Sequence, residues 1–353
     1  MKPTPLKLQR LFLRLHKIGE QITGTSGQTY VWHRVDEYRR MWQKAADHLG
    51  AEFSILTGDL WEIRKNGKKT RILNDKLQFD DPVTLNLAGM KPVVYRLLSE
   101  AKLRVPESRC YKLEDWYDVS SFLKRHPHGC AVKPAHGTSS GQGVTTHVMT
   151  LQELKKASIL ASLYCHELLI EPMIAGESYR LLVFKGDVLQ AVRRRGLRLT
   201  ADGTASIAEL YRRHSGITET QGRRIARQDW DFRFTLSYQE LTPDSIPAAG
   251  QQILVRSMGE PKASKAEVRT VYDEDVSGLV CAALKNDAVQ AAKIVGSDFL
   301  GVDFITTDPT VPLAQSGGVI NEVNTTPGMH HHYNPTTEAY PKVAIQLLKD
   351  LLG

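Results

Sequence analysis

Apolar and polar residues alternate along this chain with two different periods. Between residues 36 and 49 apolar side chains recur every three or four positions, which predicts an amphipathic helix. Short apolar runs that end at turn residues predict strands instead. The predicted strands cover residues 53–56, 60–63, 130–132, 144–149, 168–174, 179–184, 188–192, 300–306 and 319–323. Further helices are predicted at residues 115–125, 151–163, 275–295 and 337–352. This mixture predicts an α+β or α/β fold.

Two segments interrupt this pattern. Residues 80–98 are predicted to pass from a short extended stretch into a helix, with Pro92 near its first turn. The run 168–174 contains Pro172, which cannot continue as a regular interior strand, so we expect a hinge there. Residues 193–265 are polar and Arg-rich and predict no definite element. Their charge is typical either of a solvated basic surface or of a site for an acidic partner.

Composition and charge narrow the class of protein. The chain has 353 residues, 41% hydrophobic and 24% charged, which is enough for two or three packed units of an ordinary soluble protein. Neither a membrane-spanning run nor a secretory signal is recognisable, so a cytoplasmic location without a membrane partner is expected. The four cysteines form no CxxC pair, which argues against a disulfide framework or a zinc site. The net charge of +7 permits nucleic-acid binding, but no binding motif accompanies it, so we expect no nucleic-acid partner.

A glycine-rich stretch follows Lys133, with Gly137, Gly141 and Gly143 separated by hydroxyl residues. Strand, glycine-rich hairpin and strand together form a flap whose backbone N–H groups can cover phosphates, because glycine allows close approach. Lys133 would add a fixed positive charge. The alternative is a tight turn without a ligand, and the stretch lacks the Gly-Lys-Ser/Thr ending of a Walker A loop.

Three oxygen-bearing side chains lie on two predicted strands near the C-terminus. Glu322 and Asn324 are two residues apart and therefore share one face of a strand. Asp303 can meet them if the two strands pair as a hairpin. Two carboxylates and an amide oxygen are the donors that Mg²⁺ prefers beside phosphates. The alternative is polar decoration of exposed strand faces.

The adjacent histidines His330, His331 and His332 follow a sharp turn at residues 325–328. Neighbouring residues cannot readily all point at one ion, so a transition-metal site is the weaker interpretation. A role in lining a substrate pocket is favoured.

These parts resemble the ATP-grasp superfamily of carboxylate–amine ligases, most closely the ATP-grasp module of cyanophycin synthetase-like peptide ligases and more distantly D-alanine–D-alanine ligase. The matching motifs are Val132-Lys133-Pro134 with its glycine loop, 170–180, 301–303 and 322–328. The glycine loop is one residue longer than in the cyanophycin module, and the Mur-ligase-like half is absent, so polymer synthesis is not expected.

The resemblance implies an ATP-grasp fold of three parts. An N-terminal pre-ATP-grasp α/β domain would cover residues 1–95. A small lid subdomain with the glycine-rich flap would cover 96–172, and a C-terminal subdomain with the metal site would cover 173–353. The two α+β subdomains would enclose the ATP cleft.

The resemblance also implies the roles of individual residues. Two Mg²⁺ ions would be held by Asp303 and Glu322, with Asn324 on the second ion. Arg180 and Arg194 would contact phosphate or acyl-phosphate, and together with Gly328 and His332 they would meet the substrate. The residues implied to contact ATP are Lys91, Lys133, His136, Gly137, Ser139, Ser140, Gly141, Gly143, Glu171, Met173, Ile174, Glu177 and Ser178.

The expected activity is ATP-dependent formation of an amide between an amino acid or small peptide and an amino compound. It would proceed through an acyl-phosphate, with catalytic roles for Lys133, Arg180 and Arg194, and release ADP and phosphate. Three alternatives use the same parts: ring closure to a lactam, a phosphotransferase, and a nucleotide-binding sensor without turnover. Dimers are the commonest closed assembly, so a homodimer is a possible state.

Overall fold

The structure is a computed structural model that describes residues 5–22, 28–137, 143–237, 239–255, 274–335 and 337–353. It divides into two compact units. The first unit combines Met1–Arg193 with Asp273–Gly353, and the second comprises Arg194–Tyr272. Each unit is described by itself. The predicted three-part division at residues 95 and 172 stays a prediction.

A five-stranded sheet forms the centre of the first unit, in the order β12-β9-β8-β13-β14. Its resolved pairings are antiparallel, and β13 lies between β8 and β14. Central position explains why β13 is apolar along most of its length and why seven of its eight residues are buried. The strands are β8 (Glu177–Phe184), β9 (Asp187–Arg194), β12 (Glu274–Asp275), β13 (Phe299–Thr306) and β14 (Val319–Thr325).

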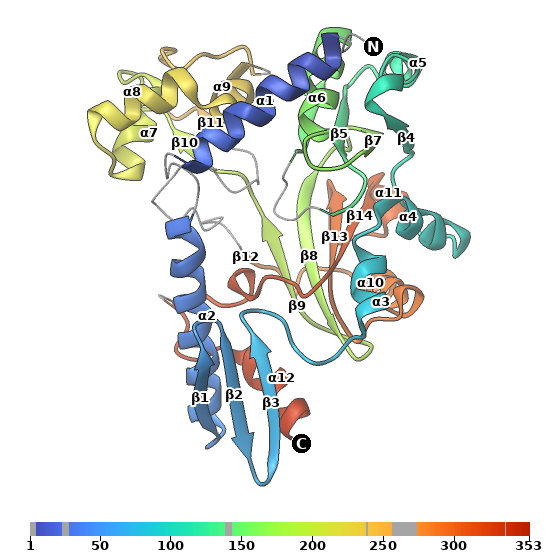
Figure 1. Cartoon of the computed structure of the whole chain (residues 1–353), viewed down its shortest axis with the longest axis vertical. Helices are drawn as coiled ribbons and strands as arrows, with labels where there is room; N and C mark the ends of the chain where they lie inside the picture. Colours follow the sequence, from blue (N-terminus) through green and yellow to red (C-terminus); the bar gives the residue numbers. More distant parts are fainter. Residues whose placement is uncertain (1–4, 23–27, 138–142, 238, 256–273, 336) are drawn as a thin grey trace. The chain divides into compact units, whose positions relative to one another are not determined.

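Helices cover one face of this sheet. Leu181 and Val302 belong to a core that also contains buried side chains of α3, α4 and α10. Figure 1 shows α10 and α3 running beside the strands. These helices are α3 (Pro82–Ala88), α4 (Lys91–Glu100) and α10 (Ala282–Val295), with the short α11 (Leu313–Ser316) ahead of β14.

The opposite face of the sheet carries a second core, to which Leu182, Phe184 and Phe299 contribute. Residues of α2, β2, β3 and α12 supply most of the rest of it, with Met329 and Tyr333, and Trp42 and Trp61 are fully buried there. The three strands β1–β3 form an antiparallel meander next to α2 (Figure 1). The elements are α1 (Pro5–Ile22), α2 (Gln28–His48), β1 (Glu52–Thr57), β2 (Leu60–Lys65), β3 (Lys68–Leu73) and α12 (Lys342–Leu352).

A four-stranded antiparallel sheet, in the order β4-β7-β5-β6, carries the glycine-rich stretch. It has its own core, which includes Phe122, Val132 and Leu154. Thr150 begins the helix α6 with a reciprocal cap to Glu153, which fixes the direction in which the chain leaves β6. The elements are β4 (Arg109–Lys112), η1 (Leu113–Asp115), α5 (Ser120–Arg125), β5 (Cys130–Pro134), β6 (Thr145–Val148), α6 (Leu151–Ala161) and β7 (Glu167–Pro172).

The second unit has a small core of its own, with Phe232 and Ile253 fully buried. Its two short strands pair with each other and with no strand of the larger sheets among the described residues. Its elements are β10 (Arg198–Thr200), α7 (Ile207–Ser215), α8 (Glu219–Gln228), α9 (Trp230–Ser237) and β11 (Gln252–Leu254).

Most predicted elements of the first unit are confirmed, with shifted ends. The extended stretch predicted before residue 91 was wrong: Asp81 caps the helix α3 there by accepting hydrogen bonds from two backbone N–H groups. The strand β3 was missed, because its exposed lysines and arginine hide the alternation. Helices α5, α10 and α12 begin five to seven residues later than predicted, and the polar residues before them form turns or strand β12.

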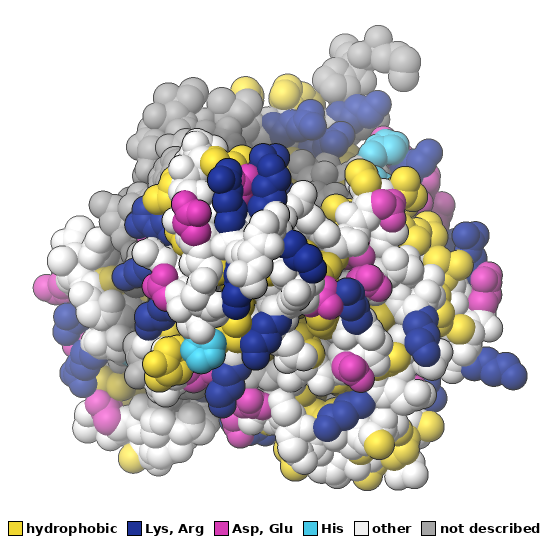
Figure 2. All heavy atoms as spheres, turned by 90° about the horizontal axis from the view of Figure 1, so that it is seen from below, with side chains coloured by type: hydrophobic (Ala, Val, Ile, Leu, Met, Phe, Trp, Pro, Cys, Tyr) yellow, Lys and Arg dark blue, Asp and Glu magenta, His cyan; other side chains and the backbone are white. Residues whose placement is uncertain are grey.

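Two surface properties bear on the predicted partners. No helix in the described part of the chain combines the length and hydropathy needed to cross a membrane. On the face shown in Figure 2, Lys and Arg side chains are interspersed with Asp and Glu. The net charge of +7 is therefore not gathered into one basic patch on that face.

Candidate active site

The predicted metal ligands meet on the central sheet. Strand β13 pairs with β14 so that Asp303 lies opposite Glu322, and it pairs with β8 so that Asp303 also lies opposite Arg180. Arg180 donates two parallel hydrogen bonds to Asp303, of 2.6 Å from Nε and 2.7 Å from Nη2. Asn324 Nδ2 donates a third to Asp303 Oδ2 at 3.2 Å. The hairpin on which the metal prediction depended is confirmed.

Gly301 makes room for this arrangement. A Cβ atom at this position would lie 3.2 Å from Cδ of Arg180 and 3.2 Å from Cβ of Pro327. Both contacts are tighter than ordinary van der Waals separation, so a side chain here would press on the arginine and on the turn after β14. The glycine thus lets Arg180 fold along the sheet to reach Asp303.

Two lysines approach the same region from other elements. Lys91 begins α4, and its Nζ lies 3.0 Å from Oε1 of Glu322. Lys133 lies near the end of strand β5, and its Nζ lies 2.6 Å from Oε1 of Glu171 on β7. Both lysines and Glu171 are buried. A buried charge is tolerated only when it is paired, and here each lysine has a carboxylate.

The electrostatics keep Glu322 ionised. Burial raises the pKa of its carboxyl group, but the charges of Lys91, Lys133 and Arg180 and a hydrogen bond from Lys91 outweigh this and lower the pKa to about 2. The same observation places the charge of Lys133 within electrostatic reach of Glu322. Strands β5 and β14 therefore both contribute charged side chains to one cluster.

Tyr95 is a member of this site that the sequence reasoning missed. Its hydroxyl accepts a hydrogen bond from Lys133 Nζ at 3.1 Å and lies 2.5 Å from the Asn321 carbonyl oxygen and 3.2 Å from Glu171 Oε2. Burial, followed by the charges of Glu171 and Glu322, raises its pKa well above the ordinary value, so the phenol stays protonated. A signal existed in the sequence: Tyr95 lies four residues after Lys91 and so shares its helix face.

The glycine-rich stretch is described at its two ends. Gly137 and Gly143 both have φ of +74°, and a side chain at Gly143 would clash with Tyr164 Cδ2 at 2.7 Å. His136 is exposed, with Nε2 3.4 Å from Cys165 Sγ. The implied ATP contacts Ser139, Ser140 and Gly141 lie outside the described residues.

The predicted hinge leads from β7 to β8. Met173 and Ile174 are half-buried, and the Met173 N–H donates to the Gly129 carbonyl oxygen at 3.0 Å. Ser178 is buried on β8. Glu177 Oε2 lies 3.3 Å from Nη1 of Arg193, so its carboxylate is directed to that arginine in this structure.

The predicted substrate residues lie on the turn after β14 and at the end of β9. Gly328 leaves space for His330, whose Nδ1 lies 2.7 Å from the Tyr38 hydroxyl on α2. His332 is buried, and its Nδ1 lies 3.0 Å from Gln190 Oε1 on β9. Arg194 is the last residue of β9 and the first of the second unit.

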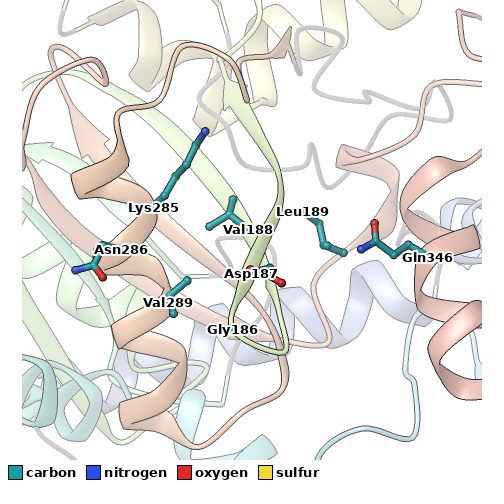
Figure 3. A pocket seen from close by; sticks show the side chains of 8 residues that line it. All are labelled: Gly186, Asp187, Val188, Leu189, Lys285, Asn286, Val289 and Gln346. Atoms are coloured by element: carbon teal, nitrogen blue, oxygen red, sulfur yellow. The ribbon is translucent and has the colours of Figure 1, made fainter.

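A pocket of about 590 Å³ lies elsewhere in the first unit. Figure 3 shows its lining, which comes from the β8–β9 turn, the start of β9, α10 and α12. None of the predicted site residues lines it. Its side chains are mainly uncharged, apart from Asp187 and Lys285. The candidate site is therefore the charged cluster on the sheet and not this pocket.

The donor set in the cluster fits divalent cations. Among the described residues no group of three or more His, Cys, Asp and Glu side chains is arranged as a metal site. The proposed set, however, is two carboxylates and an amide oxygen, and hard cations complete such a set with phosphate oxygens and water. Glu322 is ionised, and Asn324 turns its N–H₂ to Asp303, which directs its carbonyl oxygen away from that carboxylate.

Comparison with known proteins finds that the chain is similar to parts of larger biosynthetic proteins. No protein-family model matches it. It is 25% identical over 277 residues to cyanophycin synthetase of Trichormus variabilis, covering 76% of this chain and 29% of that protein. It is 25% identical over 298 residues to the glutathione biosynthesis bifunctional protein GshAB of Listeria monocytogenes, covering 82% of this chain and 36% of that protein. The chain thus spans about a third of the length of these curated relatives.

A solved structure extends the likeness to three dimensions. The bifunctional glutathione synthetase from Pasteurella multocida superposes with a TM-score of 0.54 at 22% identity, covering 89% of this chain and 44% of that chain. This similarity confirms the fold predicted from the motifs.

Proposed function

We infer that this chain, which has the ATP-grasp fold and is related to carboxylate–amine ligases, joins a carboxylate and an amine at the expense of ATP. The observation that carries the proposal is the convergence of Asp303, Glu322, Lys91 and Lys133, from four separate elements, on one face of the central sheet. The relatives named above support it, since their names describe amide-forming biosynthetic enzymes.

The charge of the cluster explains why ATP would enter with metal ions. Three cationic and three anionic side chains already balance: Lys91, Lys133, Arg180, Glu171, Asp303 and Glu322. A triphosphate adds about four negative charges, which divalent cations beside the carboxylates would offset. When bound through Asp303, Glu322 and Asn324, two Mg²⁺ ions would supply Lewis-acid stabilisation of the phosphate oxygens.

The reaction proposed has two balanced steps. An oxygen of the substrate carboxylate attacks the γ-phosphorus of ATP, the bond to the β–γ bridging oxygen breaks, and ADP leaves. The amine nitrogen then attacks the acyl carbon of the acyl-phosphate, the carbon–oxygen bond to phosphate breaks, and the nitrogen loses a proton. Lys133 would neutralise charge on the transferred group, and Arg180 and Arg194 would hold the phosphate or acyl-phosphate oxygens.

The remaining predicted residues would bind the adenine and the substrate and enclose the phosphates. Glu171, Met173 and Ile174 lie on the segment proposed to hold adenine, and Gly137 and Gly143 bound the flap proposed to cover the phosphates. Because water would hydrolyse an acyl-phosphate, closure over the site is part of the proposal. Gly328 and His332 would line the end of the site that receives the amino acid or small peptide.

An ATP-consumption screen over pairs of amino acids and amines, with mass spectrometry of the products, tests this function. The expected result is ADP, phosphate and an amide formed in equal amounts. A stable phosphoester would indicate a phosphotransferase instead, and a product that has lost water within one substrate would indicate ring closure. ATP binding without turnover under any amine would contradict the ligase proposal.

A further inference from the structure

Tyr95 occupies a position that the proposed reaction does not by itself explain. Its hydroxyl lies among three groups that belong to separate elements: Lys133 on β5, Glu171 on β7 and the backbone of Asn321 on β14. The side chain is buried, with 4% of its surface exposed. A phenol carries one proton, and the shorter distance, 2.5 Å, directs it to the Asn321 carbonyl oxygen.

The contacts with Lys133 determine the orientation of its ammonium group. An ammonium has three N–H donors. One points to Glu171 Oε1 at 2.6 Å and a second to the Tyr95 hydroxyl at 3.1 Å. Two fixed acceptors define a tetrahedral group, so the direction of the third N–H is set as well. The lysine also lies over the tyrosine ring, with Nζ 5.5 Å from the ring centre.

Through its contact with Asn321, Tyr95 connects Lys133 to β14, the strand that carries the proposed metal ligands Glu322 and Asn324. Asn321 precedes Glu322, which is held by Lys91 one helical turn before Tyr95. Helix α4 therefore contacts β14 at two successive residues. Lys91 pairs with the Glu322 side chain, and the Tyr95 hydroxyl donates to the Asn321 carbonyl oxygen. Because the Tyr95 hydroxyl contacts both Lys133 and Asn321, a displacement of Lys133 would also displace β14.

We propose that Tyr95 is a positioning residue for ATP binding. Its hydroxyl directs the third N–H of Lys133 toward the phosphates and holds β5 in place relative to β14. This inference rests on the proposed function, because it takes Lys133 as a phosphate ligand. It adds a residue that touches neither the nucleotide nor the metal ions and acts through the lysine.

The test measures binding of adenylyl imidodiphosphate with Mg²⁺ by calorimetry, which requires no knowledge of the amino substrates. Tyr95→Phe removes one hydroxyl and keeps the ring. A lost hydrogen bond to a charged group should weaken binding about 10-fold to 100-fold. Tyr111→Phe is the matched control: Tyr111 is also buried, and its hydroxyl lies 2.9 Å from Ser158 Oγ, a residue outside the site. We expect unchanged binding for this control, even where its thermal midpoint falls as far as that of Tyr95→Phe.

A double-mutant cycle with Lys133→Met separates positioning from general loosening. If Tyr95 acts through the lysine, Tyr95→Phe should weaken binding no further in the Lys133→Met background. Two results would overturn the positioning role and leave the ligase proposal intact. One is wild-type affinity in Tyr95→Phe, and the other is a loss of affinity that is fully additive to that of Lys133→Met. Failure of the wild-type protein to bind the nucleotide would overturn both. Adenosine, which lacks phosphates, should bind equally to wild type and Tyr95→Phe.

Discussion

The two units of this protein use charged side chains in opposite ways. In the first unit the site pairs, Lys91–Glu322, Lys133–Glu171 and Arg180–Asp303, join residues far apart in sequence and are largely withdrawn from water. In the second unit most of the described pairs lie within single helices, and Arg213 also pairs with Asp202, which precedes α7. Glu209 contacts Arg212 and Arg213 three and four residues on, and Glu219 contacts Arg223 four residues on.

This difference separates charges that are buried in the candidate site from charges that lie on the surface of a helix. A buried pair repays its desolvation poorly, so its presence is weak evidence for stability and better evidence for a requirement of the site. An exposed pair within one helical turn costs little to form and contributes little. The second unit is therefore held by its apolar core around Phe232, and its exposed ion pairs add little to its stability.

The two carboxylates Glu322 and Glu209 illustrate the contrast, because both have a pKa lowered to about 2. In Glu209 hydrogen bonds from Arg212 and Arg213 are the main causes, and both arginines are close in sequence. In Glu322 burial opposes ionisation, and lysines from α4 and β5 overcome it. The same pKa thus arises locally in one unit and from tertiary structure in the other.

The largest expected effect is on turnover. Glu322→Gln removes a charge from the proposed metal site and should lower ATP-dependent turnover about 100-fold to 10,000-fold, the range expected when metal stabilisation of the transferring group is lost. Steady-state assays with coupled ADP detection measure it. The control is Asp350→Asn, which breaks the exposed 2.6 Å pair with Lys185 outside the site and should leave turnover unchanged. Equal activity in Glu322→Gln and wild type would refute the metal assignment.

The next effect is on stability. Asp303→Ala should destabilise the first unit by about 3–5 kcal/mol, because Arg180 is left buried without its carboxylate. Urea unfolding followed by tryptophan fluorescence measures the loss. Replacing both partners, in Arg180→Met with Asp303→Leu, should recover much of it, since the uncompensated charge is gone. A double variant less stable than Asp303→Ala would contradict this account of the pair.

Acid should lower the stability of the first unit over a defined pH range. Because the folded-state pKa of Glu322 is lowered from 4.5 to about 2, its contribution to stability is present above pH 4.5 and is lost as the pH falls toward 2. Wild type should therefore lose more unfolding free energy between pH 4.5 and pH 2 than Glu322→Gln does. Urea midpoints at intervals of pH measure the difference, and parallel curves for the two proteins would exclude the predicted contribution.

The smallest effect is expected in the second unit. Glu209→Gln removes the negative charge that accepts three arginine hydrogen bonds, yet the pairs are solvent-screened, so the urea midpoint should move little. Any shift should fade when the salt concentration is raised, because screening weakens exposed pairs. A shift in the urea midpoint as large as that of Asp303→Ala, and unchanged by salt, would show that the ion pairs of the two units do not differ in their contribution to stability.

Much of the fold of the first unit could be predicted from local patterns. Alternation and turn residues located β5, β8, β9, β13 and β14, and the last two pair as the metal hypothesis required. The second unit could not be predicted. Polar and charged residues make up more than half of α7 and α8, and the core depends on a few apolar residues that are widely spaced in sequence.

The candidate site divides in the same way. Lys133, Asp303, Glu322 and Asn324 were found because each follows a strand or shares a strand face, which is a local property. Tyr95 was missed because an isolated tyrosine on a helix is ordinary, and only the packing of α4 against β7 and β14 brings its hydroxyl to the lysine.

By itself the sequence determined which residues carry charge and oxygen donors, and which strand face each occupies, because side-chain direction along a strand alternates with fixed period. Only the tertiary structure decided which charges meet. Burial and distance depend on how separate elements pack, so the assignment of Arg180 to Asp303, Lys91 to Glu322 and Tyr95 to Lys133 required the folded chain.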